Sequence, residues 1–247
     1  MINFEAVRNG FNHEEFFLEY LPIISLDNNC CLGAEALIRW RRASEVVLPD
    51  DFIPIIENTP LSGLVTYWVV DRVAKELGAW LKASDGVHIA INVPPEILGR
   101  GGLEYVIKRS GLMDVASKLI IEVTERGVPD KLAIDALNNA ERYGARVALD
   151  DVGVEGSNLI VLARCRVDII KIDKSVIKQI EGGEISNAVQ GIVMLMNVAH
   201  LDIIAEGVES AMQAMALKDA GVKMAQGWYF SRSLSAKDFK AFYRTHH

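Results

Sequence analysis

The sequence predicts an α/β barrel folded as a single domain over residues 1–247. The chain has 247 residues, half of them hydrophobic, close to the ~250 residues of a typical eight-stranded α/β barrel. Short apolar runs alternate with segments of helical periodicity, which is the pattern of βαβ units in a mainly parallel sheet. The runs are apolar on both faces, as strands buried beneath helices should be.

Eight strand-like runs and five helical segments follow one another along the chain. The segment 61–82, rich in Val, Ala, Leu and Trp, is expected to be a helix packed on the barrel. Pro94–Pro95 marks the start of a helix after the third run, and Gly182–Gly183 marks a loop. Eight strands in this length favour a closed barrel over an open sheet. We expect strands at 16–25, 31–39, 88–93, 118–123, 146–150, 168–172, 202–206 and 224–230, and helices at 61–82, 104–110, 130–143, 185–199 and 208–219.

The first two runs break this alternation. Only the segment Leu26-Asp27-Asn28-Asn29-Cys30 lies between them, which is too short for the crossover that parallel neighbours need. They should form an antiparallel hairpin, so the expected barrel is a modified one with an antiparallel first strand.

Charge and composition argue against several classes of protein. A net charge of −7 and a pI near 5.3 disfavour a binder of nucleic acid polymers. No stretch approaches the ~20 apolar residues of a membrane span, and the first residues lack the features of a signal peptide. The three cysteines are too few and wrongly spaced for a zinc site or a disulfide framework. We therefore expect a cytoplasmic protein that does not bind membranes.

The one basic cluster surrounds Trp40 and contains Arg39, Arg41 and Arg42. A solvated strand end explains so short a cluster, and the sequence alone favours that explanation. The alternative is a local contact with a phosphate or a base near Glu35.

Polar side chains recur where the apolar runs end. Two adjacent acids, Asp150–Asp151, follow Val147-Ala148-Leu149, although neighbouring acids repel and rarely close a buried strand unless a cation neutralises them. In a barrel the carboxyl ends of the strands converge, so these side chains should meet. The set comprises Glu35, Asn92, Glu122, Asp150, Asp151, Lys171 and Glu206.

Each signal has a simpler explanation when taken alone. Glu35 can cap a turn, Asn92 can be a turn residue, and Glu122 and Glu125 can be exposed acids on a strand. Lys171 is harder to explain in this way, because a lysine between isoleucines is costly to bury unless it meets carboxylates or a phosphate.

Together these residues predict a site for hard divalent cations. Mg²⁺ and Mn²⁺ prefer oxygen ligands, and four or five carboxylates with one Asn amide can hold two ions, with one Asp bridging them. Two ions ~3.5–4 Å apart are a common arrangement for in-line attack on a phosphate diester. Lys171 would orient the attacking water or neutralise the transition state. The set contains no His or Cys, which argues against zinc.

The order of these motifs resembles that of the EAL-domain family, bacterial phosphodiesterases that linearise cyclic di-GMP to 5′-pGpG. The resemblance runs from Tyr20-Leu21-Pro22-Ile23 to Phe230-Ser231-Arg232 and implies one domain of this type over 1–247. The family fold is a modified TIM (β/α)8 barrel with an antiparallel first strand, which agrees with the expected hairpin. The matching motifs are Glu35-Ala36-Leu37, Asn92, Glu122-Val123-Thr124-Glu125, Asp150-Asp151, Lys171-Ile172-Asp173, Ala205-Glu206-Gly207-Val208-Glu209 and Gln226-Gly227.

The resemblance implies a metal-dependent hydrolase with two Mg²⁺ or Mn²⁺ ions per site, inhibited by Ca²⁺. Asp150 matches the bridging ligand, Glu206 a ligand that also assists as a base, and Lys171 the residue that contacts the catalytic water. With Glu35, the last two form the catalytic set. The metal ligands implied are Glu35, Asn92, Glu122, Asp150, Asp151 and Glu206.

Further roles follow from the same resemblance. Leu37, Arg39 and Gln226 match positions that hold the dinucleotide. Glu125 matches an acid that anchors the loop after the Asp pair, and Glu209 matches another acid that supports the site. The resemblance also implies a homodimer, and regulation through oligomerisation, a partner protein or a longer parent protein.

Three positions depart from the family pattern. The loop Val152–Asn158 lacks the usual Thr and Tyr and carries Glu155 at a glycine position, which bears on catalytic rate and its regulation. Leu21 replaces the usual Gln before Pro22, and Ser233 stands where Pro is usual.

Two alternatives to the hydrolase follow. The altered loop favours a receptor that holds cyclic di-GMP, or a protein partner, without turnover. A purely structural barrel would require the acids, Lys171 and Gln226 to match by coincidence.

Overall fold

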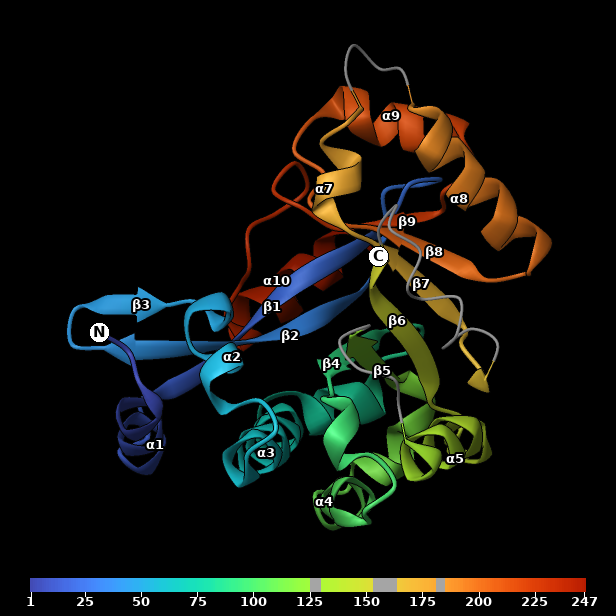
Figure 1. The fold of residues 1–247 in the computed structure, drawn as a ribbon. Coiled ribbons are helices and arrows are strands. Elements are labelled where there is room, and N and C mark those ends of the chain that lie inside the picture. The colour runs from blue at the N-terminus through green and yellow to red at the C-terminus, as the bar shows by residue number, and fades with distance from the viewer. Residues whose placement is uncertain (125–129, 153–163, 181–184) are drawn as a thin grey trace.

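The computed structural model describes residues 1–124, 130–152, 164–180 and 185–247 (Figure 1). Its centre is a closed barrel of eight strands, and a further strand, β3, pairs with β2 outside the ring. The strands are β1 (Phe16–Ser25), β2 (Cys31–Arg42), β3 (Glu45–Val47), β4 (His88–Asn92), β5 (Leu119–Thr124), β6 (Arg146–Val152), β7 (Ile169–Ile172), β8 (Asp202–Ala205) and β9 (Met224–Ala225).

The barrel is mixed because its first strand runs against both neighbours. β1 pairs antiparallel with β2 on one side and with β9 on the other, while all pairs from β2 through β4 to β9 are parallel. The expected barrel with an antiparallel first strand is therefore confirmed.

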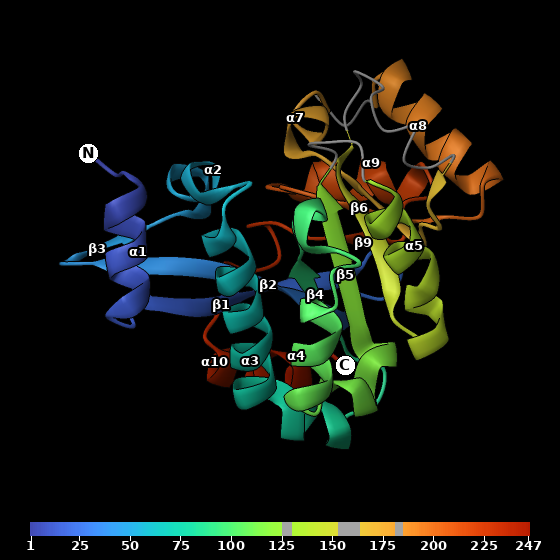
Figure 2. The same ribbon diagram turned by 60° about the horizontal axis from the view of Figure 1, so that its bottom comes forward.

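The hairpin of β1 and β2 is longer than the barrel needs. Its far end projects from the ring as a two-stranded ribbon, which carries β3 and lies beside helix α1 (Figures 1 and 2). Phe16 stacks on Trp40 at 5.5 Å between ring centroids, and Phe52 packs edge-on against both rings. This aromatic cluster gives the projecting end an apolar core of its own.

Helices cover the outside of the barrel (Figures 1 and 2). Helices α3, α4 and α5 lie along one side, and α7, α8 and α9 lie close together on a second side. The longest, α3, buries a row of Leu and Val side chains, as the expected helix at 61–82 should. The helices are α1 (Phe4–Asn12), α2 (Ile53–Ile56), α3 (Pro60–Ala83), α4 (Gly102–Arg109), α5 (Lys131–Asn139), α7 (Lys174–Ile177), α8 (Asn187–Val198), α9 (Ala211–Asp219) and α10 (Ala236–Thr245), with 3₁₀ turns η1 (Pro49–Asp51), η2 (Pro95–Ile97), η3 (Leu112–Lys118) and η4 (Ala140–Tyr143).

The expected strand at 224–230 was wrong in length, because β9 ends at Ala225. After Gln226 the chain leaves the sheet and pairs with the loop after β8, where Val208 N donates to Gln226 O and Tyr229 N to Val208 O. Gly227 permits this close approach, since a Cβ there would lie 2.3 Å from Val208 N.

Several elements were not expected from the sequence: α1, α2, α7, α10 and β3. The short ones carry too few residues for a periodic signal, and α10 packs Phe239 and Tyr243 into the core from an otherwise polar segment. The loop expected at Gly182–Gly183 lies outside the described residues.

Candidate active site

The candidate site lies inside the barrel, next to an apolar layer and on the side of that layer toward the carboxyl ends of the parallel strands. Six buried side chains make up that layer, one each from β1, β4, β5, β6, β7 and β8: Ile23, Ala90, Ile120, Ala148, Ile169 and Ile204, with Met224 of β9 packed against them.

Side chains of a strand alternate between its two faces, so the residue two positions after an inward one also points inward. On five parallel strands that next inward position, near the carboxyl end, holds a residue of the expected site. These residues are Asn92, Glu122, Asp150, Lys171 and Glu206, and Gln226 follows Met224 in the same way. The barrel thus places a polar layer on top of an apolar one.

Lys171 is the centre of this polar layer and is completely buried. Its Nζ lies 2.7 Å from Glu206 Oε1 and 3.0 Å from Glu122 Oε2. Glu35 Oε2 and Asp150 Oδ1 each lie 3.2 Å away. Four carboxylates from β2, β5, β6 and the end of β8 therefore converge on one ammonium group.

Two amides complete the arrangement around Glu35. Asn92 Nδ2 donates to Glu35 Oε1 at 2.7 Å, and Gln226 Nε2 donates to Glu35 Oε2 at 2.7 Å. Gln226 Nε2 also reaches Glu206 Oε1 at 3.0 Å. These bonds fix the carboxylate of Glu35 from both sides.

Asp150 and Asp151 sit on an irregularity of β6. The register between β6 and β7 shifts between Leu149 and Val152, and Asp151 has a left-handed backbone with φ of 58°. Adjacent residues of a regular strand point to opposite faces, whereas a bulge re-aims one of them. As a result, oxygen atoms of Asp150, Asp151 and Glu206 lie within 4.8 Å of one another.

The electrostatics of the cluster reflect an excess of negative charge in a buried place. Burial, reinforced by the neighbouring charge of Glu35, raises the pKa of Glu122 well above its ordinary value. Burial also dominates at Glu206, and although Lys171 opposes it, the charges of Asp150 and Glu35 help to raise the pKa to about 8.

Two groups of the cluster shift in the direction of their charged forms. Burial disfavours the ammonium of Lys171, but the four surrounding carboxylates outweigh it and raise its pKa. Burial likewise works against the carboxylate of Glu35, yet Lys171 and the donated hydrogen bonds lower its pKa.

These residues suit divalent cations. In the part of the chain that the structure describes, two groups of acids have ligand atoms within 4.8 Å of one another: Glu35 with Glu122 and Asp150, and Asp150 with Asp151 and Glu206. Asp150 belongs to both. Among the described residues, none donates a hydrogen bond to the buried Glu122 Oε1, which leaves that oxygen for a cation. One lysine cannot neutralise five carboxylates, and an all-oxygen donor set is the one that Mg²⁺ and Mn²⁺ prefer.

The remaining expected residues lie around this centre at different distances. Leu37 and Arg39 follow Glu35 on the same face of β2, with Leu37 half-buried and Arg39 buried. Arg41 and Arg42 are exposed, so the basic cluster is divided between a buried residue and a solvated strand end. Glu209 is exposed outside both acidic groups, where its N–H donates to Gln213 Oε1 at 2.9 Å.

Part of the expected site lies outside the described residues, namely Glu125 and all of the loop Val152–Asn158 except Val152. One residue that the sequence did not single out is Glu19, whose carboxylate accepts from Arg39 Nε at 2.9 Å. No sequence pattern marks Glu19, because the hairpin register that places it opposite Leu37 is a property of the folded structure.

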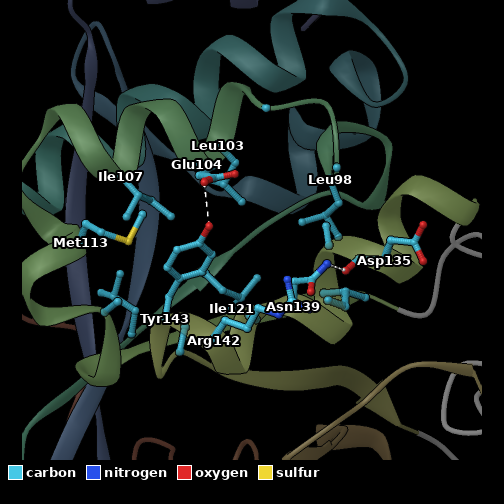
Figure 3. A pocket seen from close by; sticks show the side chains of 18 of the residues that line it. Leu98, Leu103, Glu104, Ile107, Met113, Ile121, Asp135, Asn139, Arg142 and Tyr143 are labelled. Atoms are coloured by element: carbon cyan, nitrogen blue, oxygen red, sulfur yellow. Dashed lines mark hydrogen bonds between the residues drawn. The ribbon is translucent and has the colours of Figure 1, made fainter.

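A separate cavity of about 390 Å³ lies between α4 and α5, on the outer side of β5 (Figure 3). It is lined mainly by apolar residues such as Leu103, Ile107 and Ile121, and Tyr143 donates to Glu104 at its rim at 2.8 Å. It shares no residue with the carboxylate cluster.

Comparison with known proteins identifies a family that matches almost the whole chain. The family model described as EAL domain matches residues 5–233. The chain is 31% identical over 237 residues to a probable cyclic di-GMP phosphodiesterase, PdeB of Escherichia coli K12, covering 94% of this chain and 45% of that protein. It is 29% identical to the cyclic di-GMP phosphodiesterase NbdA of Pseudomonas aeruginosa, covering 98% of this chain and 32% of that protein.

Solved structures agree with these relatives. The EAL enzyme Bd1971 in its form bound to cAMP and cyclic di-GMP superimposes with a TM-score of 0.87 at 28% identity, covering 97% of this chain and 67% of that one. The PaMucR phosphodiesterase in complex with c-di-GMP gives a TM-score of 0.84 at 27% identity, covering 95% of this chain and 98% of that one. The chain spans less than half the length of PdeB and NbdA.

Proposed function

The chain belongs to the EAL domain family, and from that premise we propose that it hydrolyses cyclic di-GMP to 5′-pGpG with the help of two divalent cations. The observation that carries the proposal is the pair of acidic groups that share Asp150 beside the buried Lys171. Phosphodiesterase relatives support the choice of substrate.

The carboxylates of Glu35, Glu122 and Asp150 would hold one Mg²⁺ or Mn²⁺, and those of Asp150, Asp151 and Glu206 the other, with the side-chain oxygen of Asn92 available beside Glu35. When bound, such ions lower the pKa of a coordinated water and stabilise charge on phosphate oxygens.

Lys171, Glu206 and the substrate-binding residues would act on the reactants, and two further acids would support the site. Lys171, charged because four acids surround it, neutralises negative charge that develops on the phosphate and orients the attacking water. Glu206, as the resemblance implies, accepts the proton that this water loses. Leu37, Arg39 and Gln226 hold the dinucleotide across the barrel mouth, and Glu125 and Glu209 support the surrounding loops.

The proposal is tested by incubating the purified protein with cyclic di-GMP in Mg²⁺, Mn²⁺ or Ca²⁺ and separating the products by chromatography. Formation of 5′-pGpG is expected with Mg²⁺ or Mn²⁺, and inhibition with Ca²⁺, whose looser coordination disturbs a two-ion geometry. Glu35→Ala removes a ligand and the acceptor of both amides, and should lower the rate at least about 1000-fold. Intact cyclic di-GMP after long incubation with each ion would refute hydrolysis.

A second candidate is a receptor that binds cyclic di-GMP without cleaving it. It is favoured by one observation, the departure of the loop Val152–Asn158 from the family pattern immediately after the two acids. Calorimetric titration in Ca²⁺ followed by a turnover assay in Mg²⁺ separates the two functions, since a receptor binds tightly and yields no product. A homodimer, a regulatory partner and a cytoplasmic location remain predictions.

Among the described residues, no helix has both the length and the apolar character required to cross a bilayer.

A further inference from the structure

Arg39 shares one face of the β1–β2 ribbon with Glu35. The two are four residues apart on β2, so both point to the side that carries the carboxylate cluster. On β1, the register places Leu21 opposite Glu35 and Glu19 opposite Leu37. Opposed residues of an antiparallel pair lie on the same face, which makes Glu19 a diagonal neighbour of Arg39.

Glu19 and Ser233 hold the guanidinium of Arg39 in a closed triangle of hydrogen bonds. Arg39 Nε donates to Glu19 Oε2 at 2.9 Å, and Ser233 Oγ donates to the same oxygen at 2.6 Å. Ser233 Oγ in turn accepts from Arg39 Nη2 at 3.5 Å. Arg39 Nη1 is held by Ile38 O at 3.0 Å.

The three side chains of this triangle are partly shielded from solvent, which strengthens the ion pair between Arg39 and Glu19. The side chain of Arg39 is 10% exposed and that of Glu19 29% exposed. A partly desolvated ion pair is weakened much less by water and salt than a surface pair. Because Glu19 balances the charge of Arg39, this arginine contributes to ligand binding more by the direction of its N–H groups than by net charge.

Ser233 comes from a distant part of the sequence but is fixed against the ribbon. Its neighbour Leu234 forms two backbone hydrogen bonds with Tyr20, one at 2.8 Å and the other at 2.9 Å. The hydroxyl of Ser233 is therefore delivered to Glu19 by backbone pairing. The family-typical proline at this position has no hydroxyl to donate.

We propose that Ser233 is a positioning residue for the nucleotide: acting through Glu19, it locks the Arg39 guanidinium so that its outer N–H groups present a fixed fork to paired acceptor atoms of the ligand. A planar fork of this kind recognises a phosphate or the O6/N7 edge of guanine. The inference rests on the proposed function, because it names how the same site holds cyclic di-GMP.

Steady-state kinetics of three variants test this role. Ser233→Ala should raise KM about fivefold and leave kcat within about twofold of the unaltered protein, because Arg39 binds substrate without taking part in the chemical step. Ser233→Thr retains the hydroxyl and should restore KM. Ser231→Ala is the matched control: its hydroxyl, two residues away, donates to Arg232 O, and its removal should change neither constant.

A double-mutant cycle establishes that Ser233 acts through Glu19. Glu19→Ala should raise KM at least as much as Ser233→Ala, and the double variant should be no worse than Glu19→Ala alone. Additive effects of the two substitutions on log KM would overturn the assignment.

A ligand-free measurement separates this inference from the proposed function. The Nε–H signal of Arg39 in a ¹⁵N spectrum is identified by its loss in Arg39→Lys, and its hydrogen exchange should quicken about threefold or more in Ser233→Ala but not in Ser231→Ala. If the unaltered protein neither cleaves nor binds cyclic di-GMP, the proposed function fails while this exchange result still reports on the lock. If the unaltered protein is active but Ser233→Ala and Ser231→Ala have the same KM and the same hydrogen-exchange rate at Arg39 Nε, the positioning role of Ser233 is refuted.

Discussion

Lys171 is a buried lysine that keeps its positive charge because carboxylates surround it. It is fully buried, yet four carboxylates lie within 3.2 Å of its Nζ and keep it charged. The same acids remain in excess over this single cation, so the pKa values of Glu122 and Glu206 rise. In their charged forms Glu122 and Glu206 therefore oppose folding, and additional positive charge at the cluster would offset this cost.

Glu206 supplies a pH-dependent prediction. Its folded-state pKa is about 8 against an ordinary 4.5, so the native protein binds more protons than the unfolded chain between these values. Stability therefore falls as pH rises through this window. In chelator, Glu206→Gln should become more stable than the unaltered protein by about 2 kcal/mol or more at pH 8.5, but not at pH 4.5.

Urea unfolding across this pH range measures the difference. Glu209→Gln, which removes an exposed acid outside the cluster, is the control and should follow the unaltered protein. A constant difference between Glu206→Gln and the unaltered protein at all pH values would contradict the assignment.

At the scale of elements, the ends of the strands determine which residues reach the site. The bulge in β6 brings Asp150 and Asp151 into one acidic group, although they are adjacent on a strand. β2 and β4 approach so closely that Gly33 has no room for a side chain: a Cβ there would lie 2.0 Å from His88 O. Glu35, two residues later on β2, is positioned by this contact.

Two glycine substitutions test the packing of these elements. Gly33→Ala should lower the free energy of unfolding by about 3 kcal/mol or more, because the backbone of β4 must move. Gly78→Ala lies on α3, where the new Cβ would meet no atom within 4 Å apart from its chain neighbours and the backbone of its own helix, and it should raise the free energy of unfolding by up to about 1 kcal/mol through helix propensity. If chemical denaturation gave the same change in the free energy of unfolding for both substitutions, β2 and β4 would have room for a side chain at Gly33.

On the scale of the whole molecule, the candidate site exists because the barrel closes and brings the ends of separate strands together. Its acids come from β2, β5, β6 and the end of β8, its lysine from β7 and its amides from β4 and the end of β9. A cation bound among them would connect strands on different sides of the ring, and its binding would then be linked to global stability.

Thermal unfolding with and without Mg²⁺ measures this linkage. At a hundredfold excess over the dissociation constant, the gain is about 2.7 kcal/mol. For a chain of this size that is about 5–10 °C in Tm. Asp150→Ala should remove the rise, because both acidic groups contain this residue, whereas Glu209→Ala should retain it. An undiminished rise in Asp150→Ala would place the ions elsewhere.

Sequence patterns alone predict the alternation of strands and helices, the antiparallel first hairpin and the set of polar residues at the strand ends. These features are local, since apolar periodicity and the five-residue link Leu26–Cys30 require no knowledge of distant neighbours. The length of β9 was not accessible in this way, because Val208 and Tyr229 end it by pairing outside the sheet.

How these residues meet depends on the three-dimensional fold. Closure of the ring turned separate strand ends into one cluster around Lys171, and the bulge aligned two acids that a regular strand would have directed apart. It also joined Glu19, Arg39 and Ser233, which are separated by up to 214 residues along the chain. Contacts of this kind depend on register and closure, and the short-range pattern of a sequence carries neither.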